Sequence, residues 1–178
     1  MAVLSIRQYP DPVLREPGAP VAAVDASVRQ LARDLAETMY AAPGIGLAAP
    51  QVGVQRRVVV YRISEEDELR TLVNPTIAES SGTQTDDEGC LSIPGLAYPV
   101  TRAQRVRVRA LSLDGAELDY EAEDLEARVI QHELDHLDGI LFIDRIDDAQ
   151  RREALRIVRE RALSGAPAPA QPSPAARI

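Results

Sequence analysis

The only two histidines of the chain lie four residues apart, in the segment His132-Glu-Leu-Asp-His136. Residues at this spacing share one face of an α-helix, so both imidazoles can reach a single metal ion. Glu133 follows the first histidine directly and can act there on a water molecule as general base. Leu125 and Val129 fall on the same helical face, so we expect apolar side chains to cover the site. The fold must therefore place this helix where a metal centre can be enclosed.

A catalytic metal site of this kind needs a third protein ligand and one open position. No third histidine exists, which leaves Cys90, the single cysteine, or a downstream carboxylate such as Asp144 or Asp147. Gly89 precedes Cys90, and a glycine lets the backbone approach a site closely. A lone cysteine is equally typical of a small buried apolar side chain, so the residues alone leave the third ligand open.

The segment 44–53 is rich in small residues: it contains glycines, alanines and one amide side chain, that of Gln51. It is compatible with a tight turn before a strand. It is also compatible with a backbone cradle in which Gln51 donates a hydrogen bond to a ligand.

Composition excludes several classes of function. All 20 basic residues are arginine, so a Schiff-base or phosphate-loop lysine is impossible. The net charge of −8 argues against a protein whose surface binds DNA or an anionic membrane. One cysteine cannot form a disulfide within the chain. Without a membrane-span or signal-peptide pattern, we expect a cytoplasmic protein.

Periodicity predicts an α+β fold in which antiparallel sheets pack around the central His132–His136 helix, with one further helix towards each terminus. Ser27 is the expected cap of the first helix, and Gly139 the expected stop of the central one. The expected strands are 57–63, 70–77, 101–113 and 116–122, and 80–87 is expected to be a loop. We expect one domain over 1–163 and a disordered Ala/Pro-rich tail over 164–178.

Three segments together resemble the motifs of the peptide deformylase family, in the same order and at similar separations. They are Gly44-Ile-Gly-Leu-Ala-Ala-Pro-Gln51, Glu88-Gly-Cys-Leu-Ser92 and Gln131-His-Glu-Leu-Asp-His136. The resemblance covers about residues 1–162. It implies an enzyme that removes the formyl group from the N-terminal formyl-methionine of new polypeptides and releases formate, usually with one Fe²⁺ per chain. By ligand geometry Zn²⁺ suits the site equally, and Ni²⁺ or Co²⁺ are expected substitutes.

The resemblance also implies roles for individual residues. Cys90, His132 and His136 bind the metal, and Glu133 carries the proton as metal-bound hydroxide attacks the formyl carbon. Gln51 and the backbone N–H of Leu91 hold the formyl oxygen.

Substrate contacts are expected on two segments. The resemblance implies that Gly46 faces the substrate backbone. From helix phase and position we expect Ile45, Val129 and Leu125 to line the methionine pocket. A pair between Glu88 and Arg102 is expected to steady the Cys90 loop, in keeping with the family. Some members carry an arginine just after the cysteine motif, but 95–99 contains none here, so peptide contacts beyond methionine are expected to differ.

Two alternatives share the His132–His136 helix. A zinc endopeptidase would take its third ligand downstream of the helix. A metal-stabilised structural domain would need a carboxylate to close the site, and it would leave Glu133 without a role.

The last predicted helix carries Arg152, Arg156 and Arg159 on one face. The simplest interpretation is a solvated face. The alternative is an RNA-facing stripe that docks the enzyme on the ribosome, where nascent formyl-methionyl peptides emerge.

Overall fold

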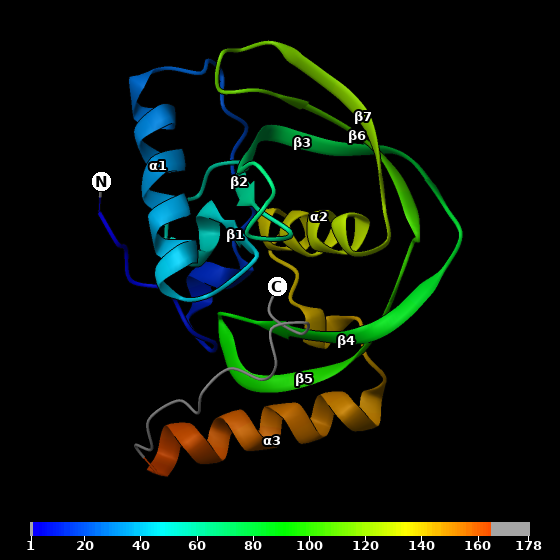
Figure 1. Ribbon diagram of the computed structural model, residues 1–178. Helices are drawn as coiled ribbons and strands as arrows, with labels where there is room; N and C mark the ends of the chain where they lie inside the picture. Colours follow the sequence, from blue (N-terminus) through cyan, green and yellow to red (C-terminus); the bar gives the residue numbers. More distant parts are fainter. Residues whose placement is uncertain (1, 165–178) are drawn as a thin grey trace.

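A five-stranded antiparallel sheet and a two-stranded hairpin lie on either side of helix α2, Asp124–Leu137, in the computed structural model, which describes residues 2–164 (Figure 1). The larger sheet has the order β1-β2-β3-β6-β7. Its strands are Gly46–Ala48, Val58–Tyr61, Arg70–Ser81, Arg105–Leu111 and Glu117–Glu123. The hairpin consists of β4, Gln84–Cys90, and β5, Ile93–Arg102.

Two further helices cover the outside. Helix α1, Ala26–Ala41, packs on β1 and β2, and α3, Asp148–Ser164, lies along β5 on the side facing away from α2 (Figure 1). Three short 3₁₀ helices complete the described chain: η1 Pro12–Arg15, η2 Ala49–Val52 and η3 Phe142–Asp144. The predicted α+β class, with antiparallel sheets and three α-helices, is confirmed.

Strand β2 shows why the sheet sits between two helices. All four of its residues are buried, which is typical of a strand covered on both faces. Val59 and Tyr61 join the apolar cluster under α2, whereas Val58 and Val60 join the cluster under α1. Strand β6, in contrast, buries alternate residues and turns Arg105 and Arg109 outwards, as its alternating sequence predicts.

Helix α2 is almost entirely enclosed, with ten of its 14 residues buried. Gly139 follows it with φ of +72°, a conformation that glycine adopts without strain and that ends the helix where predicted. Unusually for a buried helix, its enclosed residues include four with ionisable side chains between positions 132 and 136, and Arg128 as a fifth. Such groups are costly to bury unless they are paired or functional.

Three details of the sequence-based prediction are wrong. The segment 80–87 is not a loop, because β3 continues to Ser81 and β4 begins at Gln84. The expected strand 101–113 is divided between β5 and β6. Asp25 rather than Ser27 caps α1, since its carboxylate accepts from the Val28 N–H. Helix α3 includes Ser164, and the rest of the expected tail, 165–178, lies outside the described residues.

Within residues 2–164, no helix has both the length and the apolar character needed to cross a membrane.

Candidate metal centre

A thiol and two imidazoles converge beneath the hairpin. Cys90 ends β4, and His132 and His136 lie one turn apart on α2. All three side chains are buried, and one potential ligand atom from each lies within 4.8 Å of the other two. Cys90 Sγ is 3.1 Å from His136 Nε2. The structure thus brings together the three predicted ligands from two elements, although Cys90 precedes His132 by 42 residues in the sequence.

The downstream carboxylates considered as alternative ligands lie elsewhere. Asp144 forms ion pairs with Arg15 and Arg151 and accepts from the Leu141 N–H. Asp147 accepts from two backbone N–H groups at the start of α3. Both carboxylates are therefore engaged in local structure.

The unpaired ligand atoms of this cluster suit a divalent cation that binds thiolate and imidazole. His132 Nδ1 lies 3.0 Å from Glu88 Oε2, and its buried Nε2 has no hydrogen-bond partner among residues 2–164. Burial raises the pKa of Glu88, but hydrogen bonds from His132 and Arg102 outweigh burial and lower it to about 2. The carboxylate is therefore ionised, so His132 donates from Nδ1 and presents the Nε2 lone pair, the arrangement that metal-binding histidines use.

The other two candidate ligands carry no charge of their own in this enclosure. Burial, followed by the proximity of His132, keeps the pKa of His136 well below its usual value, so the imidazole is neutral. Complete burial raises the pKa of the Cys90 thiol to about 12. A cation would reverse this preference, because metal binding displaces the thiol proton.

Glu133 is the second unusual feature of the site. Its side chain is 0% exposed, and neither carboxylate oxygen has a hydrogen-bond partner within the described chain. Burial, followed by the charge of Glu88, raises the pKa of Glu133 well above its usual value. Strongly perturbed, unpaired carboxyl groups are typical of sites that transfer protons.

Gln51 is oriented by its own backbone neighbours. Its Oε1 accepts from the Ala48 N–H at 2.8 Å, which leaves Nε2 directed at Cys90 Sγ, 3.6 Å away, and at Ser92 Oγ, 3.3 Å away. Leu91 lies between those two residues, immediately after Cys90, and is buried. The amide donor predicted from the small-residue segment therefore reaches the thiol–imidazole cluster.

The predicted substrate-contacting residues divide into two groups. Gly46 lies against the site, because a Cβ there would overlap Glu133 Oε1 and approach Val129 Cγ1 to 3.1 Å. Ile45 is partly buried beside the same core cluster as Val129. Leu125, in contrast, is 37% exposed and lines an open cleft of about 480 Å³ with Tyr61 and Ile63. Leu125 is thus not part of a buried cover over the cluster.

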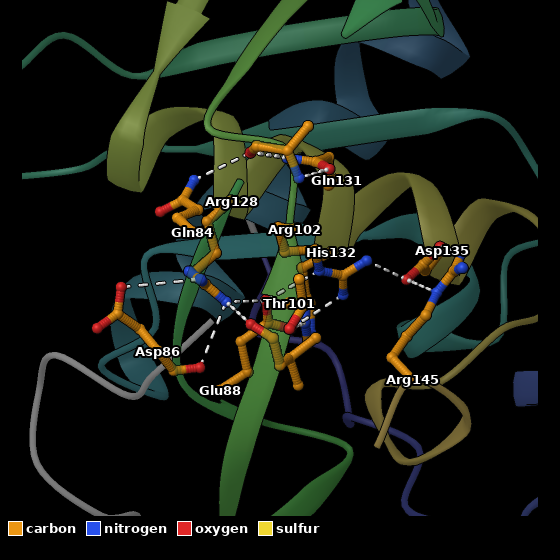
Figure 2. Close-up of polar contacts among 12 residues, drawn as sticks. Gln84, Asp86, Glu88, Thr101, Arg102, Arg128, Gln131, His132, Asp135 and Arg145 are labelled. Atoms are coloured by element: carbon orange, nitrogen blue, oxygen red, sulfur yellow. Dashed lines mark hydrogen bonds and ion pairs between the residues drawn. The ribbon is translucent and has the colours of Figure 1, made fainter. Parts of the chain in front are cut away.

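A buried ion-pair network lies behind the cluster, and sequence analysis found only one pair of it (Figure 2). The expected Glu88–Arg102 pair is present, with two hydrogen bonds of 2.9 Å. Arg102 also donates to Asp135, and Arg128 donates to Glu88. The signal that could have revealed these residues is their spacing, because Arg128, His132 and Asp135 fall at i, i+4 and i+7 on one helical face.

Comparison with known proteins agrees with this geometry. The family model described as polypeptide deformylase matches residues 3–152. A peptide deformylase of Acidothermus cellulolyticus is 50% identical over 165 residues, covering 93% of this chain and 91% of the relative. One from Alkalilimnicola ehrlichii is 53% identical over 158 residues, covering 88% and 89% of the two chains.

Solved structures give the same result. A peptide deformylase from Legionella pneumophila superposes with a TM-score of 0.85 at 39% identity, covering 93% of this chain and all of that one. One from Ehrlichia chaffeensis in complex with actinonin has a TM-score of 0.86 at 38% identity, covering 90% of this chain and 98% of that one. The chain belongs to the peptide deformylase family and is therefore an enzyme.

Proposed function

We propose that this enzyme hydrolyses the N-formyl amide of formyl-methionyl peptides and releases formate, with residues 1–163 as the catalytic unit. The observation that carries the proposal is the combination of a Cys90–His132–His136 cluster with a buried, unpartnered Glu133 carboxylate beside it. Family membership supports the reaction, and this combination supports hydrolysis by water as its chemistry. One divalent ion, bound by the three clustered side chains, would supply Lewis-acid activation of water at neutral pH.

Glu133 is the proposed proton carrier. One of its carboxylate oxygens takes a proton from the attacking water, and the same group then delivers it to the amine nitrogen as the C–N bond breaks. Burial raises the pKa of Glu133 well above its usual value, so the carboxyl group is a stronger base than an exposed glutamate and takes up a proton more readily.

The charge that develops on the formyl oxygen requires donors. Gln51 Nε2, held in place through the Ala48 N–H, is one, and the backbone N–H of Leu91 is the other. A single donor of this kind typically stabilises the transition state by about 3 kcal/mol. The missing side chain of Gly46 lets Glu133 and Val129 approach this segment closely, and the Gly46 backbone is the proposed contact for the substrate backbone. Ile45, Val129 and Leu125 are the proposed walls of the methionine pocket.

We propose Fe²⁺ as the resident metal, with Zn²⁺, Ni²⁺ or Co²⁺ as substitutes. One thiolate and two imidazoles suit Fe²⁺ and Zn²⁺ alike, and the family preference favours iron.

Anaerobically purified protein should release formate from a formyl-methionyl dipeptide and none from the acetyl-methionyl counterpart. Chelation should abolish the activity, because the ion supplies the activated water, and one equivalent of Fe²⁺ added under argon should restore it. Exposure to air should inactivate the Fe²⁺ form through oxidation of iron and then of Cys90, but spare the Ni²⁺ form.

Formate assays together with metal analysis check these expectations. A metal-replete protein that releases no formate would refute the proposed function.

Ribosome docking is proposed for α3. Arg152, Arg156 and Arg159 are all exposed, although Arg156 is paired with Glu160 at 2.8 Å. Charge reversal at all three should weaken co-sedimentation with ribosomes at low salt but leave dipeptide turnover unchanged, because the helix lies outside the hairpin, away from α2 (Figure 1). Unchanged co-sedimentation would reject docking through this face.

A further inference from the structure

The Glu88 carboxylate is the centre of the buried network behind the candidate metal site (Figure 2). It is 0% exposed and receives hydrogen bonds from three side chains. Its Oε1 accepts from Arg102 Nε at 2.9 Å and from Arg128 Nη1 at 2.7 Å. Its Oε2 accepts from Arg102 Nη2 at 2.9 Å and lies 3.0 Å from His132 Nδ1. Glu88 therefore connects the imidazole of a proposed metal ligand to two arginines.

Arg128 and His132 contact this carboxylate from adjacent turns of α2. They stand four residues apart and therefore share a helical face, and each contacts a different oxygen of Glu88. The Glu88 carboxylate thus connects the side chains of two adjacent turns of the helix. A change in its tilt would disturb both contacts at once.

Arg128 also ties the helix to the hairpin that carries Glu88. Its Nη1 donates to the carbonyl oxygen of Val100 at 2.9 Å and lies 3.4 Å from that of Asp86. Asp86 and Val100 are paired residues of β4 and β5, two positions before Glu88 and two before Arg102. Arg128 is itself only 2% exposed, and burying an arginine is costly unless its contacts compensate.

Arg102 alone would hold the carboxylate less firmly, because its guanidinium has a second partner. Its Nη1 donates to Asp135 Oδ2 at 2.6 Å, and Asp135 in turn accepts two hydrogen bonds from Arg145. Both contacts of Arg102 to Glu88 come from one guanidinium group. Arg128 approaches from a different element and adds a further hydrogen bond to Oε1.

We propose that Arg128 is a positioning residue of the metal centre, which orients the His132 imidazole by clamping Glu88 from the helix side. This inference rests on the proposed function, because it takes His132 to be a metal ligand. Outer partners of metal-binding histidines typically affect metal affinity by about 10–100-fold. Glu88 is that outer partner of His132, and Arg128 acts on the metal centre through Glu88.

The test is Co²⁺ binding by the folded protein. Arg128→Met keeps an unbranched side chain but removes every donor. Because Arg128 acts through Glu88, the Co²⁺ dissociation constant should rise by about 10-fold, the lower end of the range for direct partners. The ligand-field absorption bands of the Co²⁺ form should shift, because His132 would be less well oriented. Arg128→Lys retains the charge and a single ammonium donor group, and its affinity should lie between wild type and Arg128→Met.

Arg57→Met is the matched control. Arg57 also ties α2 to a strand, through Leu137 O at 3.3 Å and Asp138 Oδ1 at 2.6 Å, but it has no contact with Glu88. The Arg57→Met substitution should lower the unfolding temperature while leaving the Co²⁺ affinity and the Co²⁺ spectrum unchanged. This control separates loss of helix packing from loss of positioning.

An Arg128→Met protein that binds Co²⁺ with wild-type affinity and an unchanged spectrum would overturn the inference. If Arg128→Met does not fold, Arg128→Lys decides: weaker binding supports the positioning role, and wild-type binding overturns it. A wild-type protein that binds no Co²⁺ would instead refute the proposed metal site, and this inference with it.

Discussion

Replacing Glu133 with Gln should reduce kcat for formate release by at least ~10²-fold, the usual scale for a general acid–base group. The amide keeps the size and polarity of the side chain but cannot accept a proton. Metal content should stay near one ion per chain, because Glu133 is not among the three clustered ligand atoms. Steady-state kinetics and metal analysis on the same preparation measure the two quantities.

Glu160→Gln is the matched control for this experiment. Glu160 lies on α3, on the side of the hairpin that faces away from α2, and pairs with Arg156 at 2.8 Å (Figure 1). The same chemical change there should leave kcat close to wild type. A Glu133→Gln protein without metal would make Glu133 a ligand and not the proton carrier.

Cys90→Ala should lose both bound metal and activity. The substitution removes one of three ligand atoms, and two imidazoles alone hold a divalent ion weakly. Folding should survive, because alanine introduces no polar group and removes only one sulfur atom from an apolar cluster that includes Ile93 and Phe142. Metal analysis after gel filtration, together with a formate assay, checks the expectation.

Cys90→Ser distinguishes a missing ligand from a local packing defect. Serine is close to cysteine in size, but its neutral hydroxyl is a poor substitute for a thiolate, so some metal and little activity should remain. A metal-replete, active Cys90→Ala protein would contradict the assignment of Cys90 as third ligand. Because Glu133→Gln should keep its metal and Cys90→Ala should lose it, the two roles are separable.

Several elements could be predicted because the local pattern and the tertiary environment agree. The central helix ends at Leu137, just before the expected stop at Gly139, where φ is +72°. Strand β6 alternates between buried valines and outward arginines, and the turn before β7, with Gly115 at a φ of +83°, falls between the expected strands 101–113 and 116–122. In each case the residues nearby in sequence determine the outcome, through backbone conformation or through side-chain period.

The strand structure of the polar segment 80–87 could not be predicted from local pattern. Its composition is typical of a loop, yet Ser80 and Ser81 pair with β6, and residues 84–87 pair with β5. Exposed strand residues bury no side chain, so no apolar period marks them in the sequence. Their hydrogen-bond partners lie on other strands, which only the assembled sheet brings close.

The sequence by itself determined the central helix, the two histidines on one of its faces and the glutamate between them, because helical geometry relates residues that are close along the chain. Local spacing left the third ligand open and the motif resemblance pointed to Cys90; the tertiary structure places Cys90, and not the downstream carboxylates, beside those histidines. It also revealed that Arg128 joins Arg102 around Glu88, through contacts between residues 14 to 40 positions apart. The spacing of Arg128 and His132 places both on one face of the helix, but only the packing of the hairpin against that face shows that Glu88 lies opposite them.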